Sequence, residues 1–119
     1  MSMMKPLRIL IVEDEMTIAL LIEDMLADLG HEVVAMAMRI GPALEQAKAA
    51  DIDFAILDIN LDGSPSFPVA DILAERGVPF AFASGYGSTG LDPAYQQHVV
   101  VRKPFQMRDL ERAIERTAA

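Results

Sequence analysis

Six consecutive residues, Asp58-Ile59-Asn60-Leu61-Asp62-Gly63, alternate polar and apolar side chains and form the stretch best suited to chemistry. The polar positions and the closing glycine match the start of a calcium-binding loop of the EF-hand type. Such a loop needs a bidentate glutamate at its last position, which here is Val69, and a helix before its first aspartate. The residues before Asp58 have the pattern of a strand instead. The sequence therefore argues against calcium and leaves these oxygen ligands for another reaction.

Short apolar runs alternate along the chain with segments of helical periodicity. The apolar runs, which predict strands, are Leu7–Val12, His31–Ala37, Ile52–Asp58, Pro79–Ser84 and His98–Lys103. Apolar residues at helical spacing lie within Ile18–Leu29, Ile40–Ala47, Val69–Leu73 and Met107–Ile114, and the weakest such pattern lies in the glycine-rich stretch Ser84–Tyr95. This alternation predicts a parallel sheet with helices on both faces, joined by right-handed crossovers.

Polar residues stand at the ends of four predicted strands: Glu13-Asp14, Asp58, Ser84 and Lys103. In an open parallel sheet, ligands bind outside the carboxyl ends of the strands, so we expect these side chains to meet at one edge. Three carboxylates in one cleft repel one another, and a divalent cation relieves that repulsion. A few hard oxygen ligands, supplemented by water, suit Mg²⁺.

The composition limits the classes of function. The chain has 119 residues, 52% of them hydrophobic, which favours a single domain over residues 1–119. Ten Lys and Arg against 18 Asp and Glu give a net charge of −8, which disfavours direct nucleic-acid binding. The absence of cysteine excludes disulfides and thiolate metal sites. The apolar run at Leu7–Val12 is too short for a membrane span and has no signal-peptide cleavage site, so we expect a cytoplasmic protein.

Other interpretations of the same residues stay open at this point. The Asp58-x-Asn60 sequence is close to the Asp-x-Asp of haloacid-dehalogenase phosphatases, although Asn60 cannot transfer a proton. Alternatively, Asp58 caps the turn after its strand, and Glu13-Asp14 begin a helix as acids favoured by the helix dipole. We interpret His31 as a solvated residue at the start of a strand.

The chain as a whole resembles the receiver domain of two-component response regulators. The residues that carry the resemblance are Glu13-Asp14, Asp58, Ser84 and Lys103-Pro104-Phe105, each at a strand end in the order of that family. The chain is similar in particular to mostly stand-alone receivers with a Phe-Ala-Thr-Gly-Tyr-Gly stretch, which here is Phe82-Ala83-Ser84-Gly85-Tyr86-Gly87. The resemblance implies a doubly wound, flavodoxin-like α/β fold whose five parallel strands lie in the order 2-1-3-4-5.

The resemblance implies a phosphorylation site. Asp58 would accept the phosphoryl group, Lys103 would neutralise a phosphate oxygen, and Ser84 would donate its hydroxyl to another. Residues expected to take part in switching are Ser84, Tyr86, Pro104 through a cis bond, and Phe105. A departure from the family is Val100, which stands where many receivers have the aromatic residue of the switch.

The resemblance also implies Mg²⁺ as the cofactor. Asp14 and Asp58 would bind the ion through their carboxylates, Asn60 through its backbone carbonyl, and Glu13 through water. Glu13 stands where aspartate is commoner in the family, and its extra methylene would alter metal affinity or dephosphorylation without abolishing the site.

A receiver of this kind implies protein partners and no enzymatic activity on other substrates. The phosphodonor would be a histidine kinase or a histidine phosphotransfer protein. The output protein would bind the face made by the segment after Ser84, the strand at His98–Lys103 and the C-terminal helix. We expect a monomer or weak dimer, with no nucleic-acid or membrane partner. The rival class is a phosphate-insensitive pseudo-receiver, which would lack an acid or the lysine, and here none is lacking.

Overall fold

A parallel sheet lies at the centre of the fold. The structure, a computed structural model, describes residues 6–61, 63–84, 100–102 and 106–118. The strands are, in spatial order, β2 (Glu32–Ala37), β1 (Arg8–Val12), β3 (Phe54–Asp58), β6 (Phe80–Ser84) and β7 (Val100–Arg102). All neighbouring pairs run parallel. The predicted α/β class and strand order are confirmed.

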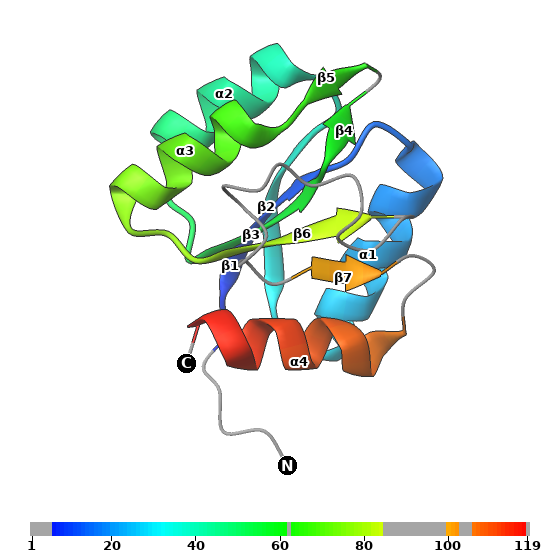
Figure 1. Cartoon of the computed structure of the whole chain (residues 1–119). Helices are drawn as coiled ribbons and strands as arrows, with labels where there is room; N and C mark the ends of the chain where they lie inside the picture. Colours follow the sequence, from blue (N-terminus) through cyan, green and yellow to red (C-terminus); the bar gives the residue numbers. More distant parts are fainter. Residues whose placement is uncertain (1–5, 62, 85–99, 103–105, 119) are drawn as a thin grey trace.

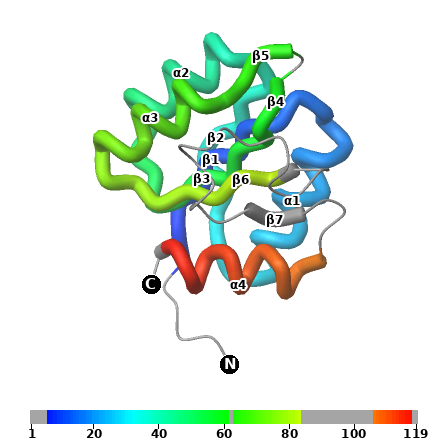
Figure 2. The backbone as a smooth tube through the Cα atoms, in the orientation of Figure 1, coloured from blue at the N-terminus to red at the C-terminus, as the bar shows by residue number. Residues whose placement is uncertain are grey.

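Helices cover both faces of the sheet (Figure 1). Helices α1 (Met16–Asp28) and α4 (Met107–Ala118) pack on one face, and α2 (Ile40–Ala49) and α3 (Phe67–Arg76) pack on the other. Figure 2 shows α2 and α3 running side by side. Along β1, Ile9 and Ile11 belong to the core under α1 and α4, while Leu10 and Val12 belong to the core under α2 and α3. Because both faces are covered, the four positions after Arg8, from Ile9 to Val12, are all apolar and buried, which explains the near-continuous apolar run in the sequence.

The ends of α3 follow from local chemistry. The helix begins at Phe67, before the first periodic residue Val69, because Pro68 is well suited to a first turn. It ends at Gly77, whose φ of 72° is the left-handed conformation that glycine adopts easily. The helix expected after Ser84 lies outside the described residues.

A short hairpin between β3 and α3 was not predicted. Its strands are β4 (Asn60–Leu61) and β5 (Ser64–Pro65), which pair antiparallel. The turn contains Gly63 with a φ of 89°. An Asp-Gly pair between two strands is a strong signal for a hairpin, so the sequence at 62–63 could have predicted this turn. The hairpin matters for function because it begins two residues after Asp58.

At the amino ends of the strands, charges are paired. The backbone N–H of Arg8 donates to Asp53 Oδ2 over 2.9 Å, and the backbone N–H of Asp53 donates to the carbonyl of Arg8 over 2.7 Å. The guanidinium of Arg8 also binds Asp53, with Nε at 3.3 Å from Oδ2, and contacts Asp51 through Nη1. These contacts join β1 to the segment that leads into β3.

His31 corrects an expectation from the sequence. It is half-buried rather than solvated, and its Nδ1 accepts a hydrogen bond from the backbone N–H of Leu7 over 3.0 Å. Burial lowers the pKa of the His31 imidazole, since the charged form loses water. An accepting Nδ1 also requires that nitrogen to be unprotonated. His31 is therefore a neutral contact that ties the chain before β1 to the start of β2.

Candidate functional site

Strands β1 and β3 end at the same level of the sheet. Their register pairs Val12 with Leu57, so the next residues, Glu13 and Asp58, leave the sheet side by side. Both strands are in the middle of the sheet, with β2 and β6 outside them. The predicted meeting of strand-end acids at one edge therefore has a direct cause in the register of two central strands.

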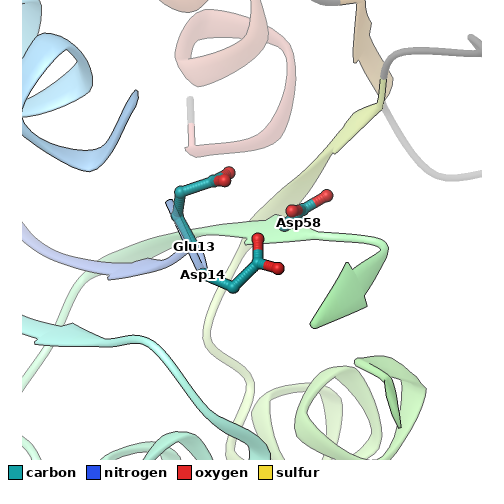
Figure 3. A group of neighbouring side chains, drawn as sticks. All are labelled: Glu13, Asp14 and Asp58. Carbon is teal, nitrogen blue, oxygen red and sulfur yellow. The ribbon is translucent and has the colours of Figure 1, made fainter. Parts of the chain in front are cut away.

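Three acidic side chains gather at this edge. Carboxylate oxygens of Glu13, Asp14 and Asp58 all lie within 4.8 Å of one another. Figure 3 shows them reaching into the same space beyond the ends of β1 and β3. Glu13 is only 1% exposed, while Asp14 and Asp58 are half-buried. Negative charges that are close together and partly withdrawn from water repel more strongly than charges on the surface.

Backbone contacts hold Glu13 in place. Its N–H donates to the carbonyl of Ala37, at the end of β2, over 3.0 Å. That alignment depends on a bulge in β2, where the register with β1 shifts by one residue and leaves Val34 without a partner in β1. The Glu13 side chain accepts a hydrogen bond from the N–H of Glu15, just before α1, over 3.3 Å. Glu13 thus joins β2, the acid cluster and the start of α1.

The hairpin determines how Asn60 is presented. Ser66 N–H donates to the carbonyl of Ile59 over 2.9 Å, so a single hydrogen bond links these two residues next to the Asn60–Pro65 pair. Hydrogen-bonded and non-hydrogen-bonded pairs alternate in an antiparallel ladder. The Asn60 carbonyl is consequently not used by the ladder, and Pro65, which has no N–H, fits opposite it. The Asn60 side chain is occupied, because its Oδ1 accepts the N–H of Gly63 over 2.9 Å.

Strand β6 brings Ser84 to the same edge. Ala83 pairs with Asp58, so Ser84 follows one residue beyond that level. The N–H of Ile59 donates to the carbonyl of Ala83 over 3.3 Å, which ties the segment after Asp58 to β6. Val100 lies on β7, opposite Phe82. The predicted residues Tyr86, Lys103, Pro104 and Phe105 lie outside the described residues.

Sequence reasoning missed the hydroxyl of Ser66. This residue is fully buried at the start of α3, and its Oγ has no hydrogen-bond partner. Its N–H and carbonyl are both used, by Ile59 and by Val69 and Ala70. No local sequence signal distinguishes it from an ordinary helix-capping serine, which would bond its hydroxyl to the helix.

The donor set of the cluster fits magnesium. Carboxylates are hard oxygen ligands, and three of them in one place provide the negative charge that a divalent cation balances. The segment before Asp58 is strand β3, so the site is not an EF-hand, in agreement with the sequence argument. A doubly wound sheet with an acid cluster beyond its central strands defines the class of receiver-like signalling domains that the sequence resembles.

Comparison with known proteins agrees with this class. Residues 9–115 match the family described as the response regulator receiver domain. The chain therefore belongs to the response regulator receiver domain family, and the phosphatase interpretation is set aside. No helix in the described ranges is long and apolar enough to cross a membrane.

Solved receivers share both fold and sequence with the chain. The solution structure of SdrG from Sphingomonas melonis Fr1 is 39% identical, with a TM-score of 0.85, and the match covers 95% of this chain and 97% of SdrG. The BeF3-activated conformation of SdrG from Pseudomonas melonis Fr1 gives a TM-score of 0.79, with 94% of this chain and 97% of that chain covered. The receiver domain of PhyR from Erythrobacter litoralis is 30% identical, with a TM-score of 0.82 and coverage of 97% and 92%.

A longer relative also matches. The transcriptional regulatory protein PdtaR of Mycobacterium tuberculosis is 30% identical over an alignment of 116 residues, and the match covers 92% of this chain and 56% of PdtaR. The chain thus spans about half the length of the curated relatives that it matches.

Proposed function

We propose that this chain is a phosphorylation-controlled switch whose phosphoacceptor is Asp58. The observation that carries the proposal is the gathering of Glu13, Asp14 and Asp58 within 4.8 Å at the carboxyl edge of a receiver domain. A histidine kinase or histidine phosphotransfer protein is the donor. The phosphorus–nitrogen bond of phosphohistidine breaks as an Asp58 oxygen bonds to phosphorus, and the donor histidine leaves with its electron pair.

Mg²⁺ is the proposed cofactor of this transfer. Asp14 and Asp58 would hold it through their carboxylates, Glu13 through water, and Asn60 through the carbonyl that the β4–β5 ladder leaves unused. When bound, the ion supplies positive charge that offsets the charge of the incoming phosphoryl group. The protein's contribution is to fix the acids with the β1–β3 register and to fix Asn60 with the hairpin.

Lys103 and Ser84 are proposed to bind phosphate oxygens, on the strength of their match to the receiver pattern. Phosphorylation adds about −1.5 to −2 charge and three acceptor oxygens, which attract a cation and a hydroxyl donor. Ser84, Tyr86, Pro104 with a cis bond, and Phe105 are the proposed switching residues.

The proposed output face consists of the segment after β6, strand β7 and helix α4. We place this switch in the cytoplasm as a single receiver domain over residues 1–119, a regulator rather than an enzyme acting on other substrates. The receiver match over residues 9–115 and the 97% coverage of SdrG support the assignment to a receiver domain. The phosphate-insensitive alternative is not favoured, because the acids at 13, 14 and 58 are all present and adjacent.

The test is phosphotransfer to the whole chain. With acetyl phosphate and Mg²⁺, intact mass spectrometry should show one added phosphoryl group that is labile to hydroxylamine. Asp58→Asn should abolish the increment, while Asp53→Asn, at the opposite edge of the sheet, should retain it. An increment that persists in Asp58→Asn, or that forms equally well with excess EDTA, would contradict the proposal.

A further inference from the structure

The outward side of α4 carries a row of arginines. Arg108, Arg112 and Arg116 follow one another at intervals of one helical turn, so they project from the same side of the helix. All three are exposed. The opposite side, with Leu110, Ala113 and Ile114, is buried against the sheet. The arginines are thus a surface feature that the packing of the domain does not require.

Among the described residues, no salt bridge involves these three arginines, although Glu111 and Glu115 follow Arg108 and Arg112 at a spacing of three residues. The ion pairs found there join Arg8 to Asp51 and Asp53. The carboxylate of Asp109, in the first turn of α4, accepts the N–H of Gln106 over 2.7 Å and so caps the helix. Like charges one turn apart weaken a helix. Opposite charges three residues apart offset part of that cost, since Glu111 follows Arg108 and Glu115 follows Arg112 at this spacing.

Arg108 stands at an unfavourable position for folding. It lies in the first turn of α4, where the helix dipole disfavours positive charge. It also lines a surface hollow of about 470 Å³, together with Leu29, Gln106, Met107 and Glu111. Met107 is 38% exposed, although it is a large apolar side chain. Apolar surface and an exposed cation therefore meet at the beginning of the arginine row.

We propose that the hollow and the arginine row form a docking surface for an acidic segment of a partner protein. The segment supplies an apolar side chain to the hollow at Met107 and carboxylates, spaced about one helical turn apart, to the arginines. Guanidinium groups suit this role because their fork of donors binds a carboxylate through two parallel hydrogen bonds. The inference rests on the proposed switch, whose output face includes α4, and it names the chemistry of the output partner.

The charge distribution favours separate carboxylates over a continuous polyanion. The chain carries a net charge of −8, which repels every anion in proportion to its charge, and so repels nucleic acid or an anionic membrane more than a segment with a few carboxylates. Glu111 and Glu115 form a second row, also one turn apart, beside the arginines. A uniformly charged backbone laid along α4 would meet both rows. A protein segment can place its carboxylates on the arginines and leave the glutamates facing polar groups or water.

The probe is a synthetic helical peptide with glutamates at i, i+4 and i+8 and a leucine beyond the first glutamate. Titrated into the ¹⁵N-labelled full chain, it should shift the amides of Leu29, Met107, Arg108 and Arg112 most. Arg108→Gln combined with Arg112→Gln should weaken binding by about tenfold. Lys48→Gln, an exposed cation on α2, is the matched control and should bind as the parent does.

A peptide with glutamine at the three glutamate positions should bind much more weakly, and added salt should weaken the glutamate peptide. Equal binding of the two peptides, or unchanged binding to the double arginine variant, would overturn the docking surface. So would tighter binding of a DNA duplex or of anionic vesicles than of the peptide, provided the double variant also loses that binding.

Phosphorylation separates this inference from the switch on which it rests. The double arginine variant should still accept phosphate on Asp58 from acetyl phosphate, because α4 contributes none of the clustered acids. The chain could bind the peptide, lose that binding in the double arginine variant, and yet accept no phosphate. That result would support the docking surface and contradict the switch. Phosphate uptake without arginine-dependent peptide binding, tested with and without beryllofluoride, would support the switch and contradict the docking surface.

Discussion

Charged side chains are arranged differently at the amino ends and at the carboxyl ends of β1 and β3. At the amino ends, Arg8 binds Asp53 and Asp51, so opposite charges are paired. At the carboxyl ends, Glu13, Asp14 and Asp58 bring like charges within 4.8 Å. Both ends belong to the same two strands in the same register. The sheet therefore permits either arrangement. The pairs at the amino ends join β1 to the segment before β3, whereas the clustered acids at the carboxyl ends fit the proposed Mg²⁺ site.

Hydrogen bonding shows the same contrast. At the amino edge, the N–H of Leu7 donates to Nδ1 of His31, and the N–H of Arg8 donates to Oδ2 of Asp53. At the carboxyl edge, the Ser66 hydroxyl is buried without a partner at the start of α3. Functional regions often retain arrangements that cost stability, because removing them would remove the function. The following four predictions test this contrast, from the largest expected effect to the smallest.

Asp14→Asn should weaken Mg²⁺ binding by about tenfold or more, because it removes a proposed carboxylate ligand. The same change should reduce the rise in melting temperature that Mg²⁺ gives the parent, because a ligand that binds the folded state is held less tightly. Thermal unfolding with EDTA and with Mg²⁺ measures both effects, and Asp53→Asn is the control from the other edge. An equal Mg²⁺-dependent rise in the Asp14 variant and in the parent would remove Asp14 from the metal site.

Ser66→Ala should leave the free energy of unfolding unchanged or raise it by up to about 1 kcal/mol, because it removes a buried hydroxyl without a partner. Urea unfolding measures the change. Ser64→Ala, in the half-buried hairpin position nearby, is the control for loss of a serine. A clear loss of stability in the Ser66 variant alone would mean that its hydroxyl makes a stabilising bond.

Asp53→Asn should lower the free energy of unfolding by less than about 1 kcal/mol, since this contact is partly open to water. The hydrogen bond from the Arg8 backbone, and then that from its side chain, lower the pKa of Asp53 below its ordinary value of 3.8. The folded state thus binds fewer protons, so this contribution is present above that pH and disappears as the pH falls below it. Unfolding curves from neutral to acid pH should converge with those of the variant.

The smallest expected effect is the contribution of His31 to the pH dependence of the free energy of unfolding. Burial lowers its pKa in the folded state, so the unfolded chain takes up a proton first as the pH falls below about 6.5. The protein should therefore lose a little stability, well under about 1 kcal/mol, between pH 7.5 and 5.5 (a range chosen about the ordinary histidine pKa). His31→Asn, whose amide oxygen can accept the Leu7 N–H, should lack this dependence. An equal slope in both proteins would assign the pH dependence to other groups.

Much of the fold follows from patterns along the sequence. Continuous apolar runs such as Leu7–Val12 specify strands covered on both faces, and their alternation with helical periodicity leads to the parallel sheet. Placing Glu13-Asp14 and Asp58 at strand ends was enough to predict that they would meet. These inferences succeed because periodicity and strand direction are local properties that constrain where each strand ends.

The tertiary structure decided which residues pair with one another through hydrogen bonds and ion pairs. The sequence did not indicate that His31 accepts from Leu7, that Arg8 holds Asp53, or that Glu13 reaches both the Ala37 carbonyl and the Glu15 N–H. The first two contacts join residues 24 and 45 positions apart. Such pairings depend on how β1 packs between β2 and β3, including the bulge at Val34, and no nearest-neighbour pattern contains that information. The sequence by itself thus determined which residues would reach the functional edge, and packing alone determined how each one is held there.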